Sequence, residues 1–483
     1  MLNGQCCGWL VFVINYLVLS FHRILDLNKP WMSIRGFFFA PASSVVYLQY
    51  SKKEQSYFFK MIPIQLLREN PDFVKERLGV KNFPQPELVD TILAFDESRR
   101  KIQQSLDSTL SNINSISKSI GGLMKDGKKE EAEQMKAQVA ALKENEKQFK
   151  EQVNALEKQQ FDTLVQLPNL PMADVPVGKS ADDNVEVRQG GVIPQLHATA
   201  VPHWDLIKQY DIVDFELGAK VTGSGFPFYK GKGARLQRAL SAYFLDYNTD
   251  AGYTEVIPPY MVNADSAFAT GQLPDKEGQM YEMPADGFYM IPTAEVPVTN
   301  IYRDTILKES ELPIKLTAYS PCFRREAGSF GANVRGLNRL HQFEKVEVVQ
   351  ITHPDKSSET LDSMVQHVEG LLNSLQLPYR ILRLCGGDMG FASAITYDFE
   401  VWSAAQQKWL EVSSVSNFAN YQANRLKCRF KNAEGKTQLC HTLNGSSLAL
   451  PRIMAALLEN NQTPDGIEIP KVLQSYFRGD TIN

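Results

Sequence analysis

The amino-acid sequence predicts an α+β protein, in which a long antiparallel coiled-coil hairpin of helices precedes a domain built on an antiparallel β-sheet flanked by helices. Two heptad series stand in the first third of the chain, and a proline-rich stretch follows them. Beyond that stretch, strand-like and helix-like segments mix without a regular βα alternation, which argues against a doubly wound fold. The 483 residues are enough for two or three domains.

The first sixty residues differ in composition from the rest of the chain. They hold 13 aromatic residues, and the run from Trp9 to Phe21 is apolar except for one Asn and one Ser. This run is shorter than the roughly 20 apolar residues of a membrane span, and no clear signal-peptide flanks accompany it. We therefore predict that residues 1–60 are an extension with a mis-assigned start, that the product begins at Met61, and that no stable membrane association occurs. A membrane anchor is the alternative.

Residues 61–165 have the pattern of a helical arm. After Met61 a helical segment is followed by Pro71, which fits the first turn of a second helix. From Leu88 to Ile120, positions spaced alternately by four and three residues form a heptad seam, apolar at eight of ten positions, and a second series runs from 135 to 160. Two long helices that fold back on each other are expected.

The tip of this hairpin, residues 118–129, is basic. Gly121, Gly122 and Gly127 stand between the two heptad series, where we expect the first helix to break. Four tip lysines are candidates to bind an RNA backbone: Lys118, Lys125, Lys128 and Lys129. A solvated dimerisation coiled coil is the alternative, because the arm as a whole is nearly neutral.

Residues 166–180 contain three prolines and are expected to be a stiff linker, with a second domain over 181–483. The net charge of −4 gives no sign of a nucleic-acid partner, so any site for a polyanion must be local. No phosphate-binding GxxxxGK[ST] loop is present. The cysteines have no spacing that would hold zinc, which favours free thiols and a cytoplasmic location: Cys6, Cys7, Cys322, Cys385, Cys428 and Cys440.

Two segments of the second domain place charged residues in strand-like surroundings. In IPTAEVPVTN, Thr293 and Glu295 are two residues apart, so on a strand both would point to one face. In a second segment, Arg324 and Glu326 would share one strand face, and Phe343 and Glu347 would share a face of the strand that returns. Arginine suits a phosphate or carboxylate, and an aromatic ring suits a stacked purine. Exposed charges and surface salt bridges are the alternatives.

Two further segments add a carboxylate, hydroxyls and a second arginine. In WLEVSSVSN, Glu411 stands beside Ser413 and Ser414 after an apolar strand, and these oxygen ligands suit Mg²⁺. The segment HTLNGSSLALPRIMAALLEN is expected to form a strand, a turn and an amphipathic helix, with Arg452 off the apolar stripe. A polar strand end and a solvated arginine are the alternatives.

Taken together, these segments resemble the class II aminoacyl-tRNA synthetases, and within them the seryl-tRNA synthetase family. GYTEVIPPYM (Gly252 to Met261) resembles motif 1, a dimer-interface element. CFRREAG and HQFEKVE resemble motif 2, and NGSSLALPR resembles motif 3. TAEV at 293–296, SKSIGG in the arm, VPVG at 175–178 and TGQLP at 270–274 are typical of the seryl type. The resemblance covers the chain from Met61 to the C-terminus.

The resemblance implies a class II catalytic domain that activates L-serine with ATP and transfers it to tRNA(Ser), with tRNA(Sec) as a further candidate. It implies an ATP site made of Arg324, Arg325, Glu326, Leu340, Phe343, Glu411, Val412, Ser413, Ser414 and Arg452. It implies a serine site made of Thr293, Ala294, Glu295, Arg324, Glu347 and Ser446. Glu411 and Ser414 would bind Mg²⁺, and Arg324, Glu411 and Arg452 would be the catalytic residues, with no general base.

The resemblance also implies a homodimer through motif 1, an arm that binds tRNA, and no zinc. Two other functions stay open from the residues: an amino acid ligase for a carrier protein, and an inactive or repurposed dimeric RNA-binding protein. Three residues depart from the family pattern, namely Arg325, Ser447 and Pro451. A proline inside a helix costs about 3 kcal/mol unless it lies in the first turn, so where the helix of motif 3 begins stays open.

Overall fold

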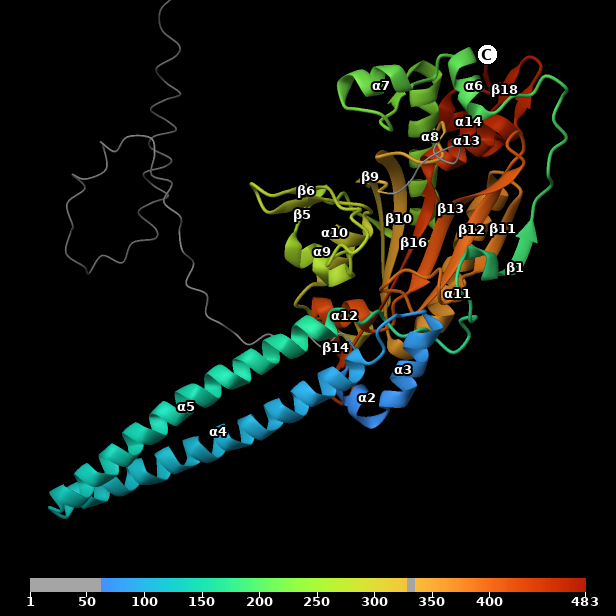
Figure 1. Ribbon diagram of the computed structural model, residues 1–483. Coiled ribbons are helices and arrows are strands. Elements are labelled where there is room, and N and C mark those ends of the chain that lie inside the picture. Colours follow the sequence, from blue (N-terminus) through green and yellow to red (C-terminus); the bar gives the residue numbers. More distant parts are fainter. Residues whose placement is uncertain (1–61, 328–334) are drawn as a thin grey trace, which may run out of the picture. The chain divides into compact units, whose positions relative to one another are not determined.

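The computed structural model describes residues 62–327 and 335–483, which belong to one compact unit (Figure 1). The predicted extension 1–60, the predicted start at Met61 and two of the six cysteines lie outside the described residues. No helix in the described ranges combines the length and apolar composition needed to span a membrane.

The described chain begins with two short helices, α2 (Ile64–Glu69) and α3 (Pro71–Val80). Pro71 lies in the first turn of α3, as predicted, where its missing N–H leaves no hydrogen bond unmade. Apolar residues of both helices pack with the bases of the two arm helices in one small core.

The arm consists of α4 (Leu88–Lys125) and α5 (Lys129–Leu164), which lie side by side as an antiparallel pair (Figure 1). The expected helix break is wrong at two of its three glycines, because Gly121 and Gly122 lie inside α4. Glycine in a helix loses only about 1 kcal/mol relative to alanine, and a 38-residue helix with a long packed seam can absorb that loss. The chain turns at Gly127, whose φ of 76° favours glycine.

The segment that follows the arm is bonded to the body of the protein. Around Asn169 this segment has no regular secondary structure. The backbone N–H of Asn169 donates to the carbonyl of Phe391 at 3.0 Å. The Asn169 side-chain amide donates to the carbonyl of Ala392 at 2.9 Å. Lys81 Nζ also donates to the Gly390 and Ser393 carbonyls. The base of the arm is therefore bonded to the segment 390–393.

Among the described residues, eight strands form the central sheet, and its neighbours are antiparallel except for the last two strands of the order below. In spatial order they are β1 (Val185–Gly190), β11 (Tyr379–Arg383), β12 (Ile395–Ser403), β13 (Lys408–Asn417), β16 (His441–Ala449), β10 (Gln342–Thr352), β9 (Ile314–Phe323) and β4 (Thr254–Glu255). The predicted α+β class and the predicted antiparallel sheet are confirmed.

Three long helices pack on one face of this sheet: α8 (Gly231–Asp250), α11 (Ser357–Ser374) and α13 (Leu450–Asn460). Alternation along β10 separates the two faces. Glu344 accepts a hydrogen bond from Gln237 of α8, and Val346 and Val348 belong to the main apolar core. Phe343, Lys345 and Glu347 alternate with these positions, so they point to the opposite face, where a cavity lies.

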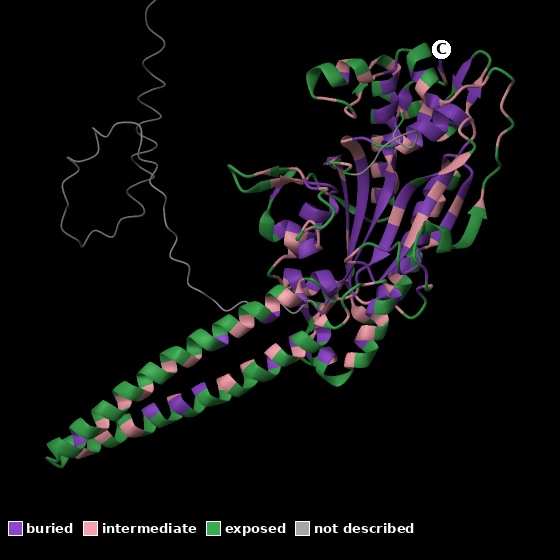
Figure 2. Ribbon diagram, in the orientation of Figure 1, coloured by how far each residue is buried: buried purple, intermediate pink, exposed green. Residues whose placement is uncertain are grey.

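The remaining described helices are short: α6 (His203–Gln209), α7 (Phe215–Val221), α9 (Ala264–Thr270), α10 (Glu295–Thr299), α12 (Tyr421–Leu426) and α14 (Gln474–Phe477). The other described strands form small sheets. One sheet pairs β2 (Val213–Asp214) with β3 (Phe228–Tyr229), and another has the order β5 (Met261–Asn263), β7 (Phe288–Met290), β6 (Glu282–Met283). A further sheet has the order β15 (Thr437–Leu439), β14 (Arg429–Lys431), β8 (Ile306–Lys308), and the last has the order β17 (Gln462–Thr463), β18 (Gly466–Glu468), β19 (Thr481–Ile482). Figure 2 shows that the central strands and α13 are largely buried, whereas the arm is mostly exposed.

Candidate active site

A cavity of about 660 Å³ lies on the face of the sheet that the long helices leave uncovered. Most of the residues that the sequence singled out line it: Thr293, Glu295, Arg324, Glu326, Leu340, Phe343, Glu347, Glu411, Val412, Ser413, Ser414, Ser446 and Arg452. These residues come from segments spread over more than 150 positions, and the register of the antiparallel strands brings them together.

Two residues of the predicted site do not line this cavity. Ala294 is fully buried in an apolar cluster with Val298 and Leu316. Arg325 is exposed and follows the end of β9, where its backbone N–H donates to the Gln279 carbonyl at 2.9 Å. Neither residue is therefore placed beside a ligand in the cavity. The four tip lysines lie at the turn of the arm, on α4, on α5 and between them.

One end of the cavity holds two buried carboxylates, Glu295 and Glu347. The expectation that Thr293 and Glu295 share a strand face is wrong, because Glu295 begins the short helix α10. The Glu347 carboxylate lies 2.6 Å from Lys345 Nζ and 3.5 Å from the Ser446 hydroxyl, which donates to it. This end of the cavity suits a small ligand with an ammonium and a hydroxyl group.

Burial, together with the neighbouring charge of Glu347, raises the pKa of Glu295 to about 7. A hydrogen bond from Gln422 Nε2 to Glu295 Oε1, at 2.6 Å, acts in the opposite direction. The Glu295 carboxyl is therefore harder to ionise unless a cation lies beside it.

The middle of the cavity carries Arg324 and Phe343. The Arg324 guanidinium lies over the Phe343 ring, 5.2 Å from its centroid, and its Nε is 3.4 Å from the Pro292 carbonyl that it donates to. The expected strand face shared by Arg324 and Glu326 is wrong, since β9 ends at Phe323 and Glu326 has a φ of 49°. The Glu326 carboxylate instead turns to Arg339, with a distance of 2.9 Å between Oε2 and Nη1.

The third part of the cavity is lined by β13. Glu411, Ser413 and Ser414 lie within this strand, rather than after it as expected. The Ser413 hydroxyl donates to the Ser446 carbonyl at 2.6 Å, so it fastens two neighbouring strands. Glu411 and Ser414 remain as oxygen donors toward the cavity.

Asp398 is a cavity residue that the sequence analysis missed. It lies on β12 directly opposite Ser414, and within the described residues its buried Oδ1 has no hydrogen-bond partner. Burial raises the pKa of Asp398 well above its ordinary value, and the charge of Glu411 raises it further. A buried acceptor without a donor, beside a second carboxylate and a hydroxyl, fits a hard divalent cation such as Mg²⁺.

Arg452 projects from the first turn of α13. Its Nε donates to the Asn338 carbonyl at 2.9 Å, and its Nη1 donates to the Glu411 carbonyl at 2.6 Å. Helix α13 begins at Leu450 directly after β16, without the expected turn, and Pro451 lies in its first turn, where it removes no helical hydrogen bond. The predicted apolar stripe of this helix is fully buried.

Two of the missed residues had a signal in the sequence. Lys345 lies midway between Phe343 and Glu347, so strand alternation places it on their face. Asp398 interrupts an apolar strand with a carboxylate that has no reason to be in a core. Gln422, which bonds Glu295, had no such signal, because it comes from a separate short helix.

Comparisons with known proteins place this geometry in a family. Residues 61–171 match the family model of the seryl-tRNA synthetase N-terminal domain, and residues 281–461 match that of the tRNA synthetase class II core domain (G, H, P, S and T). A serine-tRNA ligase of Salinibacter ruber is 53% identical over 86% of this chain and 98% of its own length. A serine-tRNA ligase of Akkermansia muciniphila is 46% identical over 87% of this chain and 99% of its own length.

A solved structure agrees with these relatives. The seryl-tRNA synthetase of Pyrococcus horikoshii, determined in complex with ATP, is 33% identical and superposes with a TM-score of 0.82. The match covers 87% of this chain and 98% of that one. The arm, the class II core and the cavity between its strands thus all agree with one assignment: the chain belongs to the seryl-tRNA synthetase family.

Proposed function

We propose that the chain is a serine-tRNA ligase, which activates L-serine with ATP to seryl-adenylate and transfers the seryl group to the 3′ end of tRNA(Ser). The observation that carries the proposal is the division of one cavity into two chemical halves. Buried carboxylates and a hydroxyl line one end, and arginines with further carboxylates line the other. The family of the chain, and relatives named for this reaction, support the same reading.

Serine would bind at the end formed by Glu295 and Glu347. Its ammonium group would lie between the two carboxylates, and its hydroxyl would meet Thr293 and Ser446, which line the same end. Its carboxylate would then face Arg324. The cation of the ligand would relieve the repulsion between the two buried carboxylates.

ATP would bind along the other half of the cavity. Phe343 offers a flat face for the adenine ring, with Glu326 near its exocyclic amine and the Leu340 backbone beside it. Arg324 would contact the α-phosphate and Arg452 the γ-phosphate. Each arginine bonds oxygens through a planar fork that stays charged.

The first step would be an in-line attack of a serine carboxylate oxygen on the α-phosphorus. A bond forms between that oxygen and phosphorus, the bond from phosphorus to the bridging oxygen breaks, and pyrophosphate leaves. Arg324 lies where it can hold both the attacking carboxylate and the phosphate that is attacked. Positioning and charge stabilisation thus account for the catalysis, and no residue has to remove a proton from the attacking group.

Glu411, Asp398 and Ser414 would hold Mg²⁺ beside the phosphates. Among residues 62–327 and 335–483, no group of three or more His, Cys, Asp or Glu side chains is placed to bind a metal by itself. The ion would therefore need the oxygens of ATP to complete its coordination, as Mg²⁺ commonly does. Once bound, it would neutralise charge on the phosphate oxygens.

In the second step, a hydroxyl of the terminal ribose of tRNA would attack the seryl carbonyl, and AMP would leave. We assign residues 61–165 to the tRNA-binding arm, 166–180 to the linker and 181–483 to the catalytic domain. Four lysines gathered around the turn of the arm support the first assignment, because a local cluster of cations binds a phosphate backbone even when the whole protein is acidic. tRNA(Sec) is proposed as a second acceptor.

The proposal includes a homodimer through the motif 1 region. Ile257 is 82% exposed, Met261 is 50% exposed and the neighbouring Tyr260 is 36% exposed, so this short stretch presents apolar side chains that a second copy of the chain would cover. Sedimentation of the purified protein should give the mass of two chains, and Ile257→Glu should shift it toward one. A cytoplasmic site of action is also proposed, on the basis of four buried free thiols in the described residues.

A charging assay tests the proposed function. Purified protein, ATP, Mg²⁺ and radiolabelled serine are combined with transcripts of tRNA(Ser), tRNA(Sec) and tRNA(Ala). Seryl groups should accumulate on tRNA(Ser) and not on tRNA(Ala), and Arg324→Ala should remove the activity. Folded wild-type protein that charges no tRNA with serine would contradict the proposal.

A further inference from the structure

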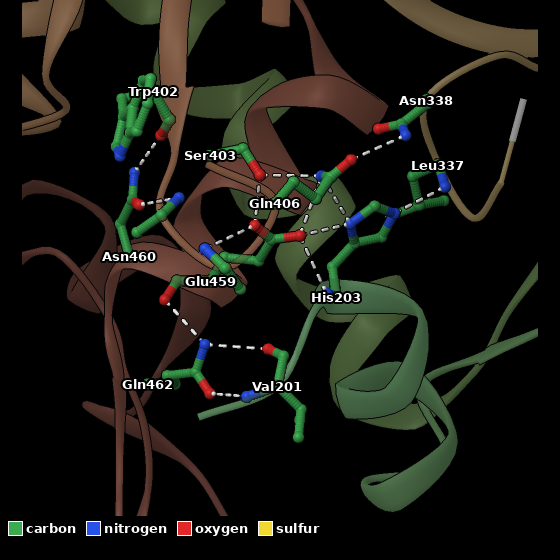
Figure 3. A network of polar contacts seen from close by, with 12 residues as sticks. Val201, His203, Leu337, Asn338, Trp402, Ser403, Gln406, Glu459, Asn460 and Gln462 are labelled. Carbon is green, nitrogen blue, oxygen red and sulfur yellow. Dashed lines mark hydrogen bonds and ion pairs between the residues drawn. The ribbon is translucent and has the colours of Figure 1, made fainter. Parts of the chain in front are cut away.

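A buried histidine and glutamate behind the cavity form a polar network that the proposed chemistry does not use (Figure 3). His203, on α6, and Glu459, on α13, are both fully buried. His203 Nδ1 lies 2.7 Å from Glu459 Oε1, and the His203 backbone N–H donates to the same oxygen at 3.0 Å. Ser403 donates to Oε2 of the same carboxylate. Buried charged groups are uncommon unless a structure needs them in place.

The partners on either side of His203 define its tautomer. The Glu459 carboxylate is an acceptor, so Nδ1 carries the proton that is donated to it. The second ring nitrogen, Nε2, accepts the backbone N–H of Leu337 at 2.9 Å. Burial would raise the pKa of Glu459, but hydrogen bonds from His203 and Ser403 outweigh it and hold that pKa below its ordinary value. The Glu459 carboxylate thus stays an acceptor, which agrees with donation from His203 Nδ1 to Glu459 and from the Leu337 N–H to His203 Nε2.

The segment bonded by His203 is part of the cavity wall. Leu337, Asn338 and Leu340 all line the cavity, and the Asn338 carbonyl accepts from Arg452 Nε. Asn338 Nδ2 donates to Gln406 Oε1 at 3.0 Å, and Gln406 Nε2 donates to Glu459 Oε1 at 2.9 Å. The Asn338 side chain and the Leu337 N–H are thus both fixed from behind the cavity (Figure 3), and the Asn338 carbonyl is bonded to Arg452.

Helix α13 is linked to the segment 337–340 through two residues, one near each end of the helix. Arg452 and Glu459 are seven residues apart, which places them on one side of the helix and about 10 Å apart along its axis. Arg452 reaches the segment directly, and Glu459 reaches it through His203. Gly336 makes the approach possible, because a Cβ at that position would lie 2.3 Å from His203 Nε2. Its φ of 64° also favours glycine.

We propose that His203 is a positioning residue for the nucleotide half of the site: together with Glu459 it fixes the segment 337–340, so that the Asn338 carbonyl orients Arg452 toward the phosphates of ATP. This inference rests on the proposed function, since it assigns the arginine to ATP. It adds a residue that does not line the cavity and touches no substrate.

Two substitutions separate the two bonds of the ring. The amide of asparagine reaches about as far as Nδ1, so His203→Asn can still donate to Glu459 but offers nothing to the Leu337 N–H. The amide of glutamine reaches about as far as Nε2, so His203→Gln can still accept from Leu337. In serine-dependent ATP–pyrophosphate exchange, His203→Asn should raise the KM for ATP about tenfold and leave the KM for serine within about twofold, because one buried bond is lost. His203→Gln should keep the KM for ATP within about threefold of wild type.

Gln462→Ala is the matched control. Gln462 belongs to the same network, where it bonds Val201 and the Glu459 carbonyl, but it has no bond to the segment 337–340 (Figure 3). It should lower the melting temperature and leave the KM for ATP unchanged. If His203→Asn does not fold, Gln406→Ala, which removes the half-buried link to Asn338, should raise the KM for ATP severalfold with the KM for serine unchanged.

The outcomes distinguish the inference from the function it rests on. Wild-type protein without serine-dependent exchange would overturn the proposed function. An active wild type would overturn the inference alone if His203→Asn and His203→Gln raised the KM for ATP equally. It would also do so if Gln462→Ala changed this KM as much as His203→Asn, or if the variants lowered only the melting temperature. A selective rise in the KM for ATP, reversed by glutamine, supports it.

Discussion

At the scale of single residues, Glu295 and Glu347 form the end of the cavity that would bind the serine ammonium group. Both carboxylates are buried within one end of the cavity, and burial together with the charge of Glu347 makes Glu295 harder to ionise. A serine ammonium would relieve this repulsion, whereas a ligand without a cation would not. The binding of a cationic ligand therefore depends on the ionisation of Glu295.

The first prediction concerns the pH dependence of serine binding. Because the pKa of Glu295 is raised to about 7, this carboxyl gains a proton as the pH falls from 8 to 6 and loses its attraction for the serine ammonium. The kcat/KM for serine should fall by up to about tenfold per pH unit below 7, while the KM for ATP changes little. Glu295→Gln should have a low kcat/KM that no longer changes in this range. A variant with the pH profile of the wild type would show that Glu295 is not the titrating group.

The same shift predicts an effect on stability. The folded-state pKa of Glu295 lies above its ordinary value of 4.5, so the folded protein binds this proton more tightly than the unfolded chain does. The stability that results is complete below about pH 4.5 and is lost as the pH rises through 7. Glu295→Gln keeps an acceptor for Gln422, so it should raise the free energy of unfolding at pH 8 by about 1 to 3 kcal/mol and change it little at pH 5. Chemical denaturation at the two pH values measures this difference, and an equal change at both would contradict the assignment.

The next prediction concerns the choice of substrate. Glu347→Ala should lower the kcat/KM for serine by about a hundredfold or more, because the variant loses a buried charge that bonds the ligand. The KM for ATP should move by only a few fold. Glu344→Gln is the control, since this carboxyl lies on the opposite face of β10 and bonds Gln237. If ATP binding collapsed while selectivity for serine over alanine survived, Glu347 would belong to the nucleotide half.

Residue types and spacings, together with the family resemblance, predicted most of the cavity, and the exceptions have physical reasons. Alternation along β10 correctly put Phe343 and Glu347 on one face. The strand argument for Thr293 and Glu295 led to the right cavity for the wrong reason, because a helix turn aims Glu295 there. Asp398 interrupts an apolar strand, but its position opposite Ser414 is set by the register of two strands, which no local pattern encodes.

At the scale of elements, the base of the arm is packed against α2 and α3. Asp96, near the start of α4, is almost completely buried, and it accepts two hydrogen bonds from Arg68, at 2.6 and 2.7 Å. Val89, Ile92 and Leu164 pack with α2 and α3 in the same region. The base of the arm is therefore part of a folded core, whereas the rest of the arm is largely exposed (Figure 2).

A truncation of the arm should separate the two steps of the reaction. Replacing residues 104–150 by a short flexible loop leaves the base intact, and it should keep serine-dependent pyrophosphate exchange within about threefold. Charging of tRNA(Ser) should fall at least a hundredfold, because the lysines that grip the RNA backbone are gone. Replacing the four tip lysines by alanine in the full-length arm is the control for a purely steric effect. Equal charging by truncated and full-length protein would contradict the role of the arm.

Heptad spacing predicted the pairing of the arm helices, but glycine did not predict where the first helix ends. The seam of apolar residues fixes how α4 and α5 pack, and this information is local. Gly121 and Gly122 stay helical because the packed seam outweighs their low helix propensity. Similarly, the sequence could not decide where the helix of motif 3 starts, whereas in the fold Pro451 lies in its first turn.

At the scale of the whole molecule, a truncated protein tests the prediction that the product begins at Met61. Protein begun at Met61 should keep wild-type kinetics and solubility, since the composition changes there and both family models begin at or after this residue. Protein begun at Gln65 is the control: it lacks Ile62 and Ile64, which are buried in the core at the base of the arm, so it should be less stable. A tenfold or greater loss of activity, about 1.4 kcal/mol, in protein begun at Met61 would assign a function to the first sixty residues.

The central claim is that one cavity joins a serine site to an ATP site. The most direct test is amino-acid-dependent exchange between ATP and radiolabelled pyrophosphate, measured without tRNA for serine, threonine and alanine. Wild-type protein should exchange with serine and at most about a hundredth as fast with alanine, because a site built to bond a hydroxyl leaves buried groups unpaired when the hydroxyl is absent. Exchange that is equally fast with alanine, or that is absent with serine in folded protein containing Mg²⁺, would contradict the claim.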